Sequence, residues 1–429
     1  MGSINILALN LGIRYSTAMN IFDSDQRMIN GPYNAIRMEG EIDGLKKIVY
    51  MFMDVHMPPQ LQTECANIYS QDFNRFLAET FHDLNGADRM YDFFMEIDPE
   101  LYKIDSAVRA EAKTKQSRGA PRDKYIRQVW QLLRSSVEYD SKGDHVSASK
   151  VFQNVRLHYL DIRGVLSDLM FGMFHLPIHF GVTVDYHPSA LFLTLGRIYR
   201  TVNHCLGIYQ DLKANPEAVP RSDDEKTPES ELVGPAFGRY VRKLLYGYKH
   251  ADVKRLITAR VDRYFGMLKD FTDMIDDFAK LLAEYGQYID AHPVTFYGDN
   301  GIRDDMTIED RVKWNSDIAF SFNQLTNQIM IAGVGITDCY LLRRVLDKDY
   351  VTNAITYTGG SHTVNYVNAL VGDFGFTVTN ISATPADSVT ELNRTIKERL
   401  SKGDIITDLL VPIPYSQCSD LTDFPLRFL

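Results

Sequence analysis

Short apolar runs that end abruptly at polar residues or proline characterise the first part of the chain. The clearest run covers residues 48–53 and stops at the segment Asp54-Val55-His56-Met57-Pro58-Pro59. A run of this length that ends at proline predicts a buried strand, as in a parallel sheet covered on both faces. Phenylalanines at helical spacing then predict a helix over about residues 70–83.

The alternation of strand-like and helix-like patterns continues on both sides of a long central region. Further strands are predicted at 92–97, 155–163, 353–357 and 376–381, and further helices at 125–137, 363–371 and 389–401. Strands that alternate with helices are typical of a parallel α/β sheet. We therefore expect an α/β fold with a mostly parallel sheet, flanking helices and a large helical insertion.

The central region is mostly helical in pattern. Its clearest element is a series of apolar residues at alternating steps of three and four, namely Val261, Tyr264, Leu268, Phe271, Ile275, Phe278, Leu282, Tyr285 and Ile289. This spacing predicts one long amphipathic helix, and its many aromatic side chains favour packing within its own domain over a coiled-coil partner. Thr307 followed by Asp310 predicts the start of the next helix.

A glycine pair in this region, Ala332-Gly333-Val334-Gly335, superficially resembles a nucleotide-binding turn. It lacks the third glycine and the preceding strand that a dinucleotide-binding fingerprint requires. We therefore interpret the small residues as a place where two helices pack closely.

These patterns predict four regions along the chain. Residues 1–46 form an N-terminal arm or short strands, and residues 47–187 form the first part of the α/β core. Residues 188–348 form the helical insertion, which contains a proline-rich, charged loop at 209–232, and residues 349–429 complete the core and add a C-terminal tail.

Charge and cysteine content narrow the class of protein. The chain has 46 basic and 56 acidic residues, a net charge of −10, which argues against general nucleic-acid binding. The basic segment 107–124 is interpreted as a solvated loop. Four scattered cysteines predict neither a disulfide framework nor a zinc site. With no transmembrane segment or signal peptide evident, we expect an intracellular, reducing location.

Residues of catalytic type stand at the ends of several predicted strands. They are His56, Glu96, His158, Asp161, Arg163 and His362. The carboxyl ends of parallel strands share one crevice, where such folds bind ligands. Imidazoles and a carboxylate there suit a general base or a divalent metal, with His56, Glu96 and His362 as metal ligands. Arg163 would hold an oxyanion.

Two glycines and several alternatives complete this picture. Gly359 and Gly360 would let the backbone approach a ligand closely. Glu96 and Arg163 would equally form a structural ion pair. A further histidine group, at 175, 179 and 187, is interrupted by proline and is not expected to bind metal. No cofactor is certain, and a divalent metal is the one that these side chains would suit.

The segment Gly359-Gly360-Ser361-His362, preceded by an apolar strand, resembles the second GxxH motif of a broad superfamily. That superfamily includes TraB and Tiki proteins, ChaN-like haem-uptake proteins and erythromycin esterases. Asp54-Val55-His56 resembles the first GxxH motif, and the strand at 93–96 resembles the glutamate strand between them. Segments at 53–56, 62–65, 92–96, 158–163 and around Cys418 are also similar to uncharacterised proteins of large DNA viruses.

The resemblance covers about 47–163 and 330–420 and implies a hydrolase-like or ligand-binding core. It implies that His56 and His362 are metal ligands or bases, that Glu96 is the partner carboxylate, and that Arg163 supports an oxyanion. Met53 stands where the family has glycine, which implies a degenerate site.

We therefore expect a viral structural or virion-associated, capsid-type protein on a TraB/ChaN-like fold. It would bind other virion or capsid proteins or associate with itself. The alternatives are an active metal-dependent hydrolase of the peptidase or esterase class, and a haem or small-ligand binding protein.

Overall fold

A computed structural model places two compact units. It describes residues 25–55, 65, 67–97, 149–162, 189–218, 237–291, 307–413 and 416–428, with isolated positions between 126 and 146. Unit 1 comprises residues 1–93, 120–157 and 352–429, and unit 2 comprises residues 94–119 and 158–351. The boundary between the units falls within two strands, β5 (Tyr91–Met95) and β8 (Val155–Tyr159).

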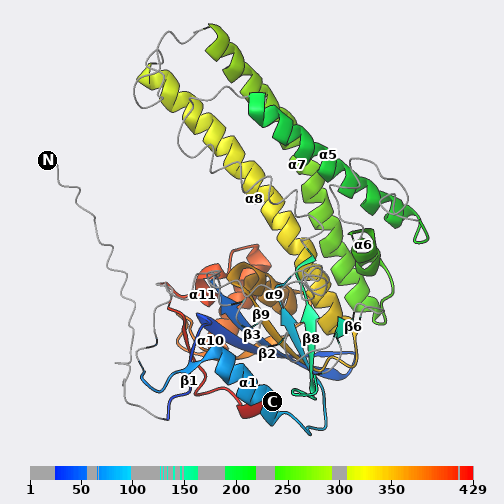
Figure 1. Cartoon of the computed structure of the whole chain (residues 1–429), viewed down its shortest axis with the longest axis vertical. Coiled ribbons are helices and arrows are strands. Elements are labelled where there is room, and N and C mark those ends of the chain that lie inside the picture. The colour runs from blue at the N-terminus through cyan, green and yellow to red at the C-terminus, as the bar shows by residue number, and fades with distance from the viewer. Residues whose placement is uncertain are drawn as a thin grey trace, which may run out of the picture. The chain divides into compact units, whose positions relative to one another are not determined.

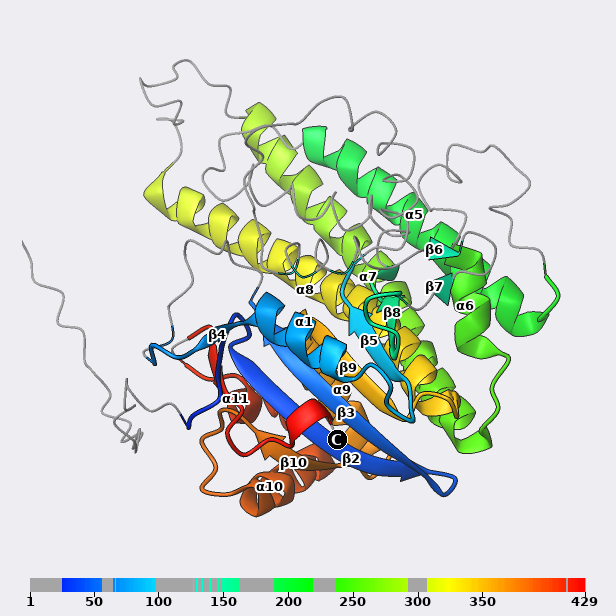
Figure 2. The ribbon, with the colours of Figure 1, turned by 60° about the horizontal axis from the view of Figure 1, so that its bottom comes forward.

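A six-stranded sheet in the order β10-β2-β3-β9-β5-β8 is the centre of the α/β fold (Figure 2). Its other strands are β2 (Asn34–Ile42), β3 (Leu45–Asp54), β9 (Asn353–Gly359) and β10 (Thr377–Ile381). β3 and β9 are parallel neighbours. β5 and β8 also run parallel. The Tyr91 N–H donates to the Asn154 carbonyl at the start of both strands, and the Leu160 N–H donates to the Met95 carbonyl at the end of both, so residue numbers increase in the same direction along the two strands.

The expectation of a mostly parallel sheet is wrong, because one side of the sheet is antiparallel. β2 and β3 form a hairpin, and β10 adds to β2 in the antiparallel sense. The hairpin turns at Asp43 and Gly44, whose φ values are 48° and 81°. Asp-Gly between two strands is a strong signal for a two-residue hairpin turn. The signal is present in the sequence, but the expectation of an N-terminal arm or short strands did not use it.

Helix α1 (Phe73–Asp83) covers one face of the sheet in unit 1, with Asp72 as its N-cap (Figure 1). Aromatic side chains fill the space between them. Phe52 of β3 lies 5.0 Å from Phe73, and Tyr357 of β9 lies 4.8 Å from Phe73. Phe428 from the last described turn of the chain joins the cluster, 5.0 Å from Tyr50.

Helices α9 (Gly360–Gly372) and α10 (Val389–Lys402) pack together on the opposite face. Ser388 caps α10, and Gly403 ends it in the left-handed conformation, φ 78°. A four-residue helix, α11 (Thr407–Leu410), and the short turn Leu426–Phe428 follow. The helices predicted at 363–371 and 389–401 therefore correspond to α9 and α10.

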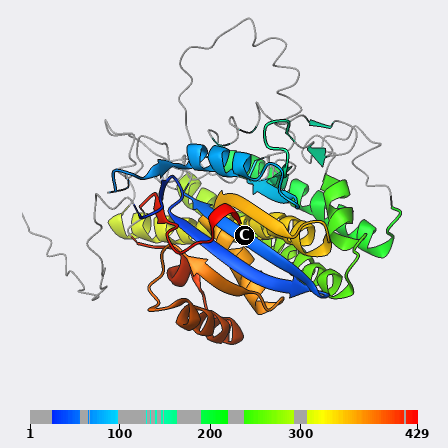
Figure 3. The ribbon, with the colours of Figure 1, turned by 90° about the horizontal axis from the view of Figure 1, so that it is seen from below.

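A small sheet joins the two ends of the described chain in unit 1 (Figure 3). Strand β1 (Met28–Asn30) pairs with β11 (Cys418–Asp420) on one side and with β4 (Gln71–Asp72) on the other. This arrangement brings Cys65 and Cys418, 353 residues apart, into a disulfide with a Cα–Cα distance of 5.1 Å.

No disulfide framework was expected from the sequence, and this single pair was not foreseen. Cysteine count no longer supports a reducing compartment, since disulfides persist in oxidising surroundings. Cys205 and Cys339 are buried thiols. A two-stranded sheet, β6 (Tyr139–Asp140) and β7 (His145–Val146), completes the described strands of unit 1.

In its described residues, unit 2 contains the helices α5 (Ser189–Ala214), α6 (Phe237–Leu245), α7 (Ala251–Ala291) and α8 (Ile308–Asp347), in this order. Figure 1 shows α7 lying lengthwise between α5 and α8. The buried residues of α7 include eight of the nine predicted from spacing, all except Ile289, so the predicted amphipathic helix is confirmed as part of its own unit. Thr307 caps α8 and accepts the Asp310 N–H, as predicted.

Close packing of α7 on α8 depends on Gly335. A Cβ atom at this position would lie 2.2 Å from the ring of Tyr264 on α7. The interpretation of the glycine pair as a helix-packing site is therefore supported at Gly335, which leaves room for a tyrosine ring.

In the described part of the chain, no helix is long and apolar enough to cross a membrane.

Candidate functional site

The ends of β3 and β9 in unit 1 are adjacent, because Asp54 pairs with Gly359 in the parallel register. Asp54 is buried and accepts a hydrogen bond from Tyr357 at 3.1 Å. His362 follows in the first turn of α9 and is only 3% exposed, with its ring 6.2 Å from that of Tyr366. His56 lies outside the described residues, so the structure places one of the two predicted histidines at this edge.

Gly360 makes a close contact, but with the chain itself. A Cβ atom at Gly360 would lie 1.7 Å from the hydroxyl oxygen of Tyr33. On either side of Gly360 in the sequence, the hydroxyl groups of Thr358 and Thr363 form a hydrogen bond of 3.2 Å. The room that the sequence analysis assigned to a ligand is therefore filled by a tyrosine side chain, which explains the need for glycine at position 360.

Glu96 and His158 belong to unit 2, at the ends of neighbouring strands. Glu96 is 9% exposed. The His158 ring stacks on Phe94 at 4.5 Å, and its Nδ1 accepts a hydrogen bond from the Arg344 guanidinium at 2.9 Å. Because Nδ1 accepts, this contact favours the neutral ring protonated on Nε2. Arg163 lies outside the described residues.

Metal ligation was a further expectation for the strand ends. Within the described ranges, no group of three or more histidine, cysteine, aspartate or glutamate side chains is placed to hold a metal ion. His362 and Glu96 fall in different units. His175, His179, His187 and the basic segment 107–124 lie outside those ranges, and so does most of the predicted N-terminal arm.

The exposed side of α8 in unit 2 is the second candidate site. Its exposed residues at helical spacing form a surface that we call the α8 face: Lys313, Ser316, Asp317, Phe320, Asn323, Gln324, Asn327 and Ile331. Phe320 is 65% exposed and Ile331 is 50% exposed. Large apolar side chains at this exposure, one above another on a helix, are typical of an interaction surface.

The charge pattern of the α8 face differs from that of α7. Between Asp317 and Asp338, α8 contains no charged residue. The exposed side of α7 is densely charged, with Asp252, Lys254, Arg255, Arg263, Lys269, Asp270, Asp273, Asp276, Asp277, Lys280, Glu284 and Asp290. The two helices pack on each other through their buried sides. The charge difference concerns their exposed sides, so the packing between them does not account for it.

Sequence reasoning did not identify the α8 face, although part of its signal is visible in the sequence. A stretch of twenty residues without charge, 318–337, is readable directly from the chain. The sequence does not show which of its apolar residues are exposed, because some of them pack against α7 and others lie on the outer side of α8. Ile318, Phe322, Leu325 and Ile329 are buried, whereas Phe320 and Ile331 are not.

Together these features define a protein with a mixed α/β unit and a long helical unit. The chain belongs to a family of unknown function, DUF5847, whose model matches residues 27–429.

Three relatives come from Acanthamoeba polyphaga mimivirus. Uncharacterized protein R706 is 31% identical and R161 is 30% identical, each over 96% of this chain and 100% of its own length. Uncharacterized protein R160 is 26% identical over 95% of this chain and 98% of its own length. No solved structure matches the chain. The predicted similarity to uncharacterised proteins of a large DNA virus is therefore confirmed.

Proposed function

We propose that this chain is a viral structural protein that associates with itself through the α8 face and is incorporated into the virion. The observation that carries the proposal is the outer side of α8 over residues 318–337, which has no charge and exposes Phe320 and Ile331, on a chain of net charge −10. Two copies of an acidic protein repel each other. They meet with least repulsion along this uncharged part of the α8 face.

The amide side chains of the α8 face support the same arrangement. Asn323, Gln324 and Asn327 each carry a donor and an acceptor, so two copies of the face can bond to one another. A face that pairs with itself about a two-fold axis is the commonest basis of homodimers. The three amides lie between Phe320 and Ile331 along α8, so in an antiparallel pair the amides of the two copies would meet at the centre, and Phe320 of each copy would face Ile331 of the other.

The test is the oligomeric state of the full chain and of a Phe320→Glu/Ile331→Glu variant by analytical ultracentrifugation. We expect the unaltered chain to form dimers or larger species and the variant to sediment as a monomer. An Ala259→Glu/Ala283→Glu variant is the matched control, because it adds two acidic residues to exposed positions of α7. A monomeric unaltered chain, or dissociation by both variants alike, would contradict the proposal.

The virion part of the proposal has its own measurement. Quantitative mass spectrometry of gradient-purified particles should find the chain in fixed ratio to the major coat protein. Washing the particles with high salt should leave that ratio unchanged, because the α8 contact contains few charges that salt can screen. Absence from purified particles would overturn this part while leaving self-association untouched.

A hydrolase on a TraB/ChaN-like core is the second candidate function. The observation that favours it is the parallel register of β3 and β9, which pairs Asp54 of the first GxxH-like segment with Gly359 of the second. We propose measuring metal content after purification without chelator, in the unaltered chain and in a His56→Ala/His362→Ala variant. Near-stoichiometric metal that is lost in the variant would support this candidate, and metal-free protein would count against the metal-dependent form.

A further inference from the structure

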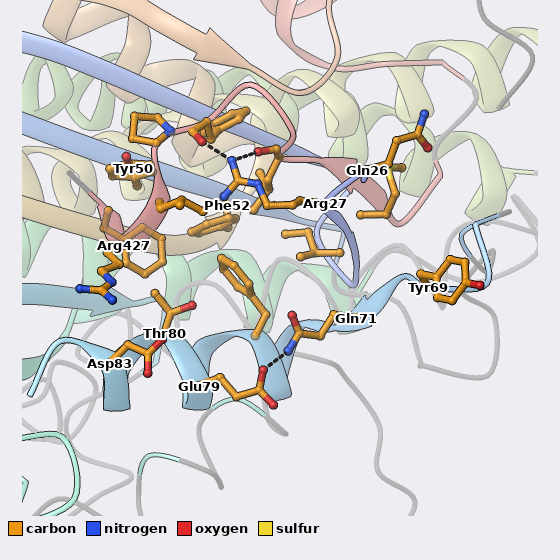
Figure 4. Close-up of a pocket in the computed structure, with 18 residues that line it drawn as sticks. Gln26, Arg27, Tyr50, Phe52, Tyr69, Gln71, Glu79, Thr80, Asp83 and Arg427 are labelled. Atoms are coloured by element: carbon orange, nitrogen blue, oxygen red, sulfur yellow. Dashed lines mark hydrogen bonds between the residues drawn. The ribbon is translucent and has the colours of Figure 1, made fainter. Parts of the chain in front are cut away.

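A groove in unit 1 lies between α1 and the C-terminal segment 421–428 and is not used by the proposed function. Its cavity volume is about 470 Å³, within the size range of ligand pockets. Figure 4 shows one wall formed by α1, which turns Glu79, Thr80 and Asp83 toward the groove, and Phe52 and Tyr50 on the opposite side. Phe76, Thr80 and Asp83 share one face of α1, because they follow one another at steps of four and three.

The lining of the groove is unusually aromatic. It contains Tyr50, Phe52, Tyr69, Phe76, Phe424 and Phe428. The chain's own Phe428 already packs against three of these rings, at centroid distances of 5.0 Å to Tyr50, 6.1 Å to Phe52 and 5.9 Å to Phe76. Tyr50 and Phe52 are buried, whereas Phe76 is half-buried and Tyr69 is exposed, so the outer part of the lining suits a second aromatic or large aliphatic side chain.

The C-terminal wall of the groove is held in place by several independent contacts. The Arg27 guanidinium donates to the carbonyl oxygens of Leu421, Thr422 and Phe424. The Cys65–Cys418 disulfide and the β1–β11 pairing fix the start of the segment. Asn353 donates to the carbonyl oxygen of Phe428 at its end. A preformed wall lowers the entropy cost of binding a ligand.

Backbone strain in the same wall also supports a binding site. Arg427 and Phe428 have φ values of 64° and 56°, in the left-handed region that non-glycine residues rarely adopt. Residues held in this conformation are strained and concentrate at active and ligand-binding sites. Here the strain turns the Arg427 side chain toward the end of the groove where Asp83 lies (Figure 4).

Asp83 and Arg427 lie at the same end of the groove, and Asp83 is the group there that attracts a positive group of a ligand. Asp83 is exposed and stands at the C-terminal end of α1, where the helix dipole attracts cations. Aromatic rings also attract cations through their faces. Arg27 directs its donors to backbone carbonyls, and burial lowers its pKa, so its charge is turned away from the cavity.

Polar groups around the cavity match the amides of a peptide. Gln26, Gln71 and Thr80 line it, and the Gln71 amide donates to Glu79 at 2.6 Å, which leaves the Gln71 carbonyl as an acceptor. Arg427 offers donors for a peptide carbonyl. Tyr69 and Leu426, 56% and 66% exposed, extend the apolar surface beyond the cavity.

We infer that this groove binds a peptide segment of a partner protein in which an aromatic or large aliphatic residue adjoins a lysine or arginine. The apolar side chain occupies the space beside Phe52 and Phe76, and the cation lies against Asp83. The inference is independent of self-association, since α8 belongs to the other unit.

The test uses three probes that differ in one side chain: N-acetyl-Phe-Lys-amide, N-acetyl-Phe-Gln-amide and N-acetyl-Phe-Glu-amide. Binding to the full chain is measured by ligand-observed NMR titration. We expect the lysine probe to bind about three-fold more tightly than the glutamine probe, as an exposed ion pair would give. The glutamate probe should bind most weakly.

Two variants locate the binding. Asp83→Asn should remove the preference for lysine over glutamine, and Thr80→Trp should abolish binding of all probes by filling the cavity. Asp88→Asn is the control, because Asp88 is exposed, pairs with Arg89 outside the groove and should leave binding unchanged. Thermal melting of each variant shows that unit 1 remains folded.

Several results would overturn the inference. They are tighter binding of the glutamate probe, undiminished binding to a folded Thr80→Trp variant, an unchanged lysine preference in Asp83→Asn, or no binding of any probe at millimolar concentration.

Discussion

Unit 1 joins segments from opposite ends of the chain, whereas the helices of unit 2 follow one another between residues 189 and 347. In unit 1, β3 pairs with β9 about three hundred residues later, and β1 pairs with β11 near the C-terminus. In unit 2, α7 and α8 are successive in sequence and form a long antiparallel pair. Long-range pairing must overcome a larger loss of chain entropy than contacts between neighbouring elements.

This contrast explains where each unit carries its specific contacts. Unit 1 uses a disulfide, the Arg27 contacts and an aromatic cluster to fix a distant tail. Unit 2 packs along apolar seams between successive helices. The turn before α7 is held by Asp347, which accepts the Lys249 and His250 N–H groups, and by Arg343, which donates to the Tyr246 and Gly247 carbonyl oxygens. The following substitutions test whether the two units depend on these different contacts.

Loss of the disulfide should have the largest effect. A Cys65→Ser/Cys418→Ser variant should lower the unfolding free energy of unit 1 by about 2–5 kcal/mol, because the bond closes a very long loop in the unfolded chain. Calorimetry with and without reductant measures this effect. The unaltered chain should be sensitive to reductant and the variant insensitive, and equal melting temperatures in all four conditions would contradict the expectation.

Gly335→Ala should weaken the packing of α8 against α7 in unit 2. Its new methyl group would overlap the Tyr264 ring, so we expect a loss of about 1–3 kcal/mol from overpacking. Gly266→Ala on α7 is the control, since open space surrounds that glycine and alanine should stabilise the helix by up to about 1 kcal/mol. If thermal melting shifts in the same direction for both, the close contact at Gly335 is not as described.

A smaller effect is expected at Gly360 in unit 1, where the clash involves a hydroxyl group that can be removed. Gly360→Ala should destabilise by about 1–2 kcal/mol, and adding Tyr33→Phe should recover most of the loss, because the nearest ring carbon stands at 3.1 Å. Chemical denaturation of the single and double variants measures the coupling. Additive effects would show that Tyr33 does not fill this space.

The smallest effect concerns pH and Glu39 on β2. Burial works to raise its pKa, but hydrogen bonds from Lys46 and Arg37 outweigh burial and hold the pKa below its usual range. A lowered carboxyl pKa stabilises the fold above the unfolded pKa, and this contribution is lost as pH falls through the folded value. Since Glu39 is largely hydrated, we expect only a few tenths of a kcal/mol.

Melting between about pH 6 and pH 3 measures this contribution. The unaltered chain should lose slightly more stability on acidification than Glu39→Gln. Identical pH profiles for the two proteins would show that the ion pairs of Glu39 contribute nothing.

Periodicity identified most elements whose signal is local. The spacing of apolar residues predicted α7, and the capping residues Thr307 and Ser388 mark the starts of α8 and α10. The strands at 48–53 and 353–357 were predicted, the first from a continuous apolar run, and both were expected in a parallel sheet, but the sequence did not show that they are neighbours. The antiparallel direction of β2 relative to β3 was not predicted. The Asp43-Gly44 turn was overlooked, and strand order is not encoded in a local pattern.

The candidate sites depended more on tertiary structure. The sequence by itself determined the class of elements, the net charge, the charge-free stretch at 318–337 and the strand-end positions of Glu96, His158 and His362. Tertiary structure alone decided that Tyr33 fills the space beside Gly360, that Arg344 binds His158, and that Cys65 meets Cys418. Local propensity acts over a few residues, whereas each of these contacts joins residues more than 180 positions apart and exists only once the sheets and helices have packed.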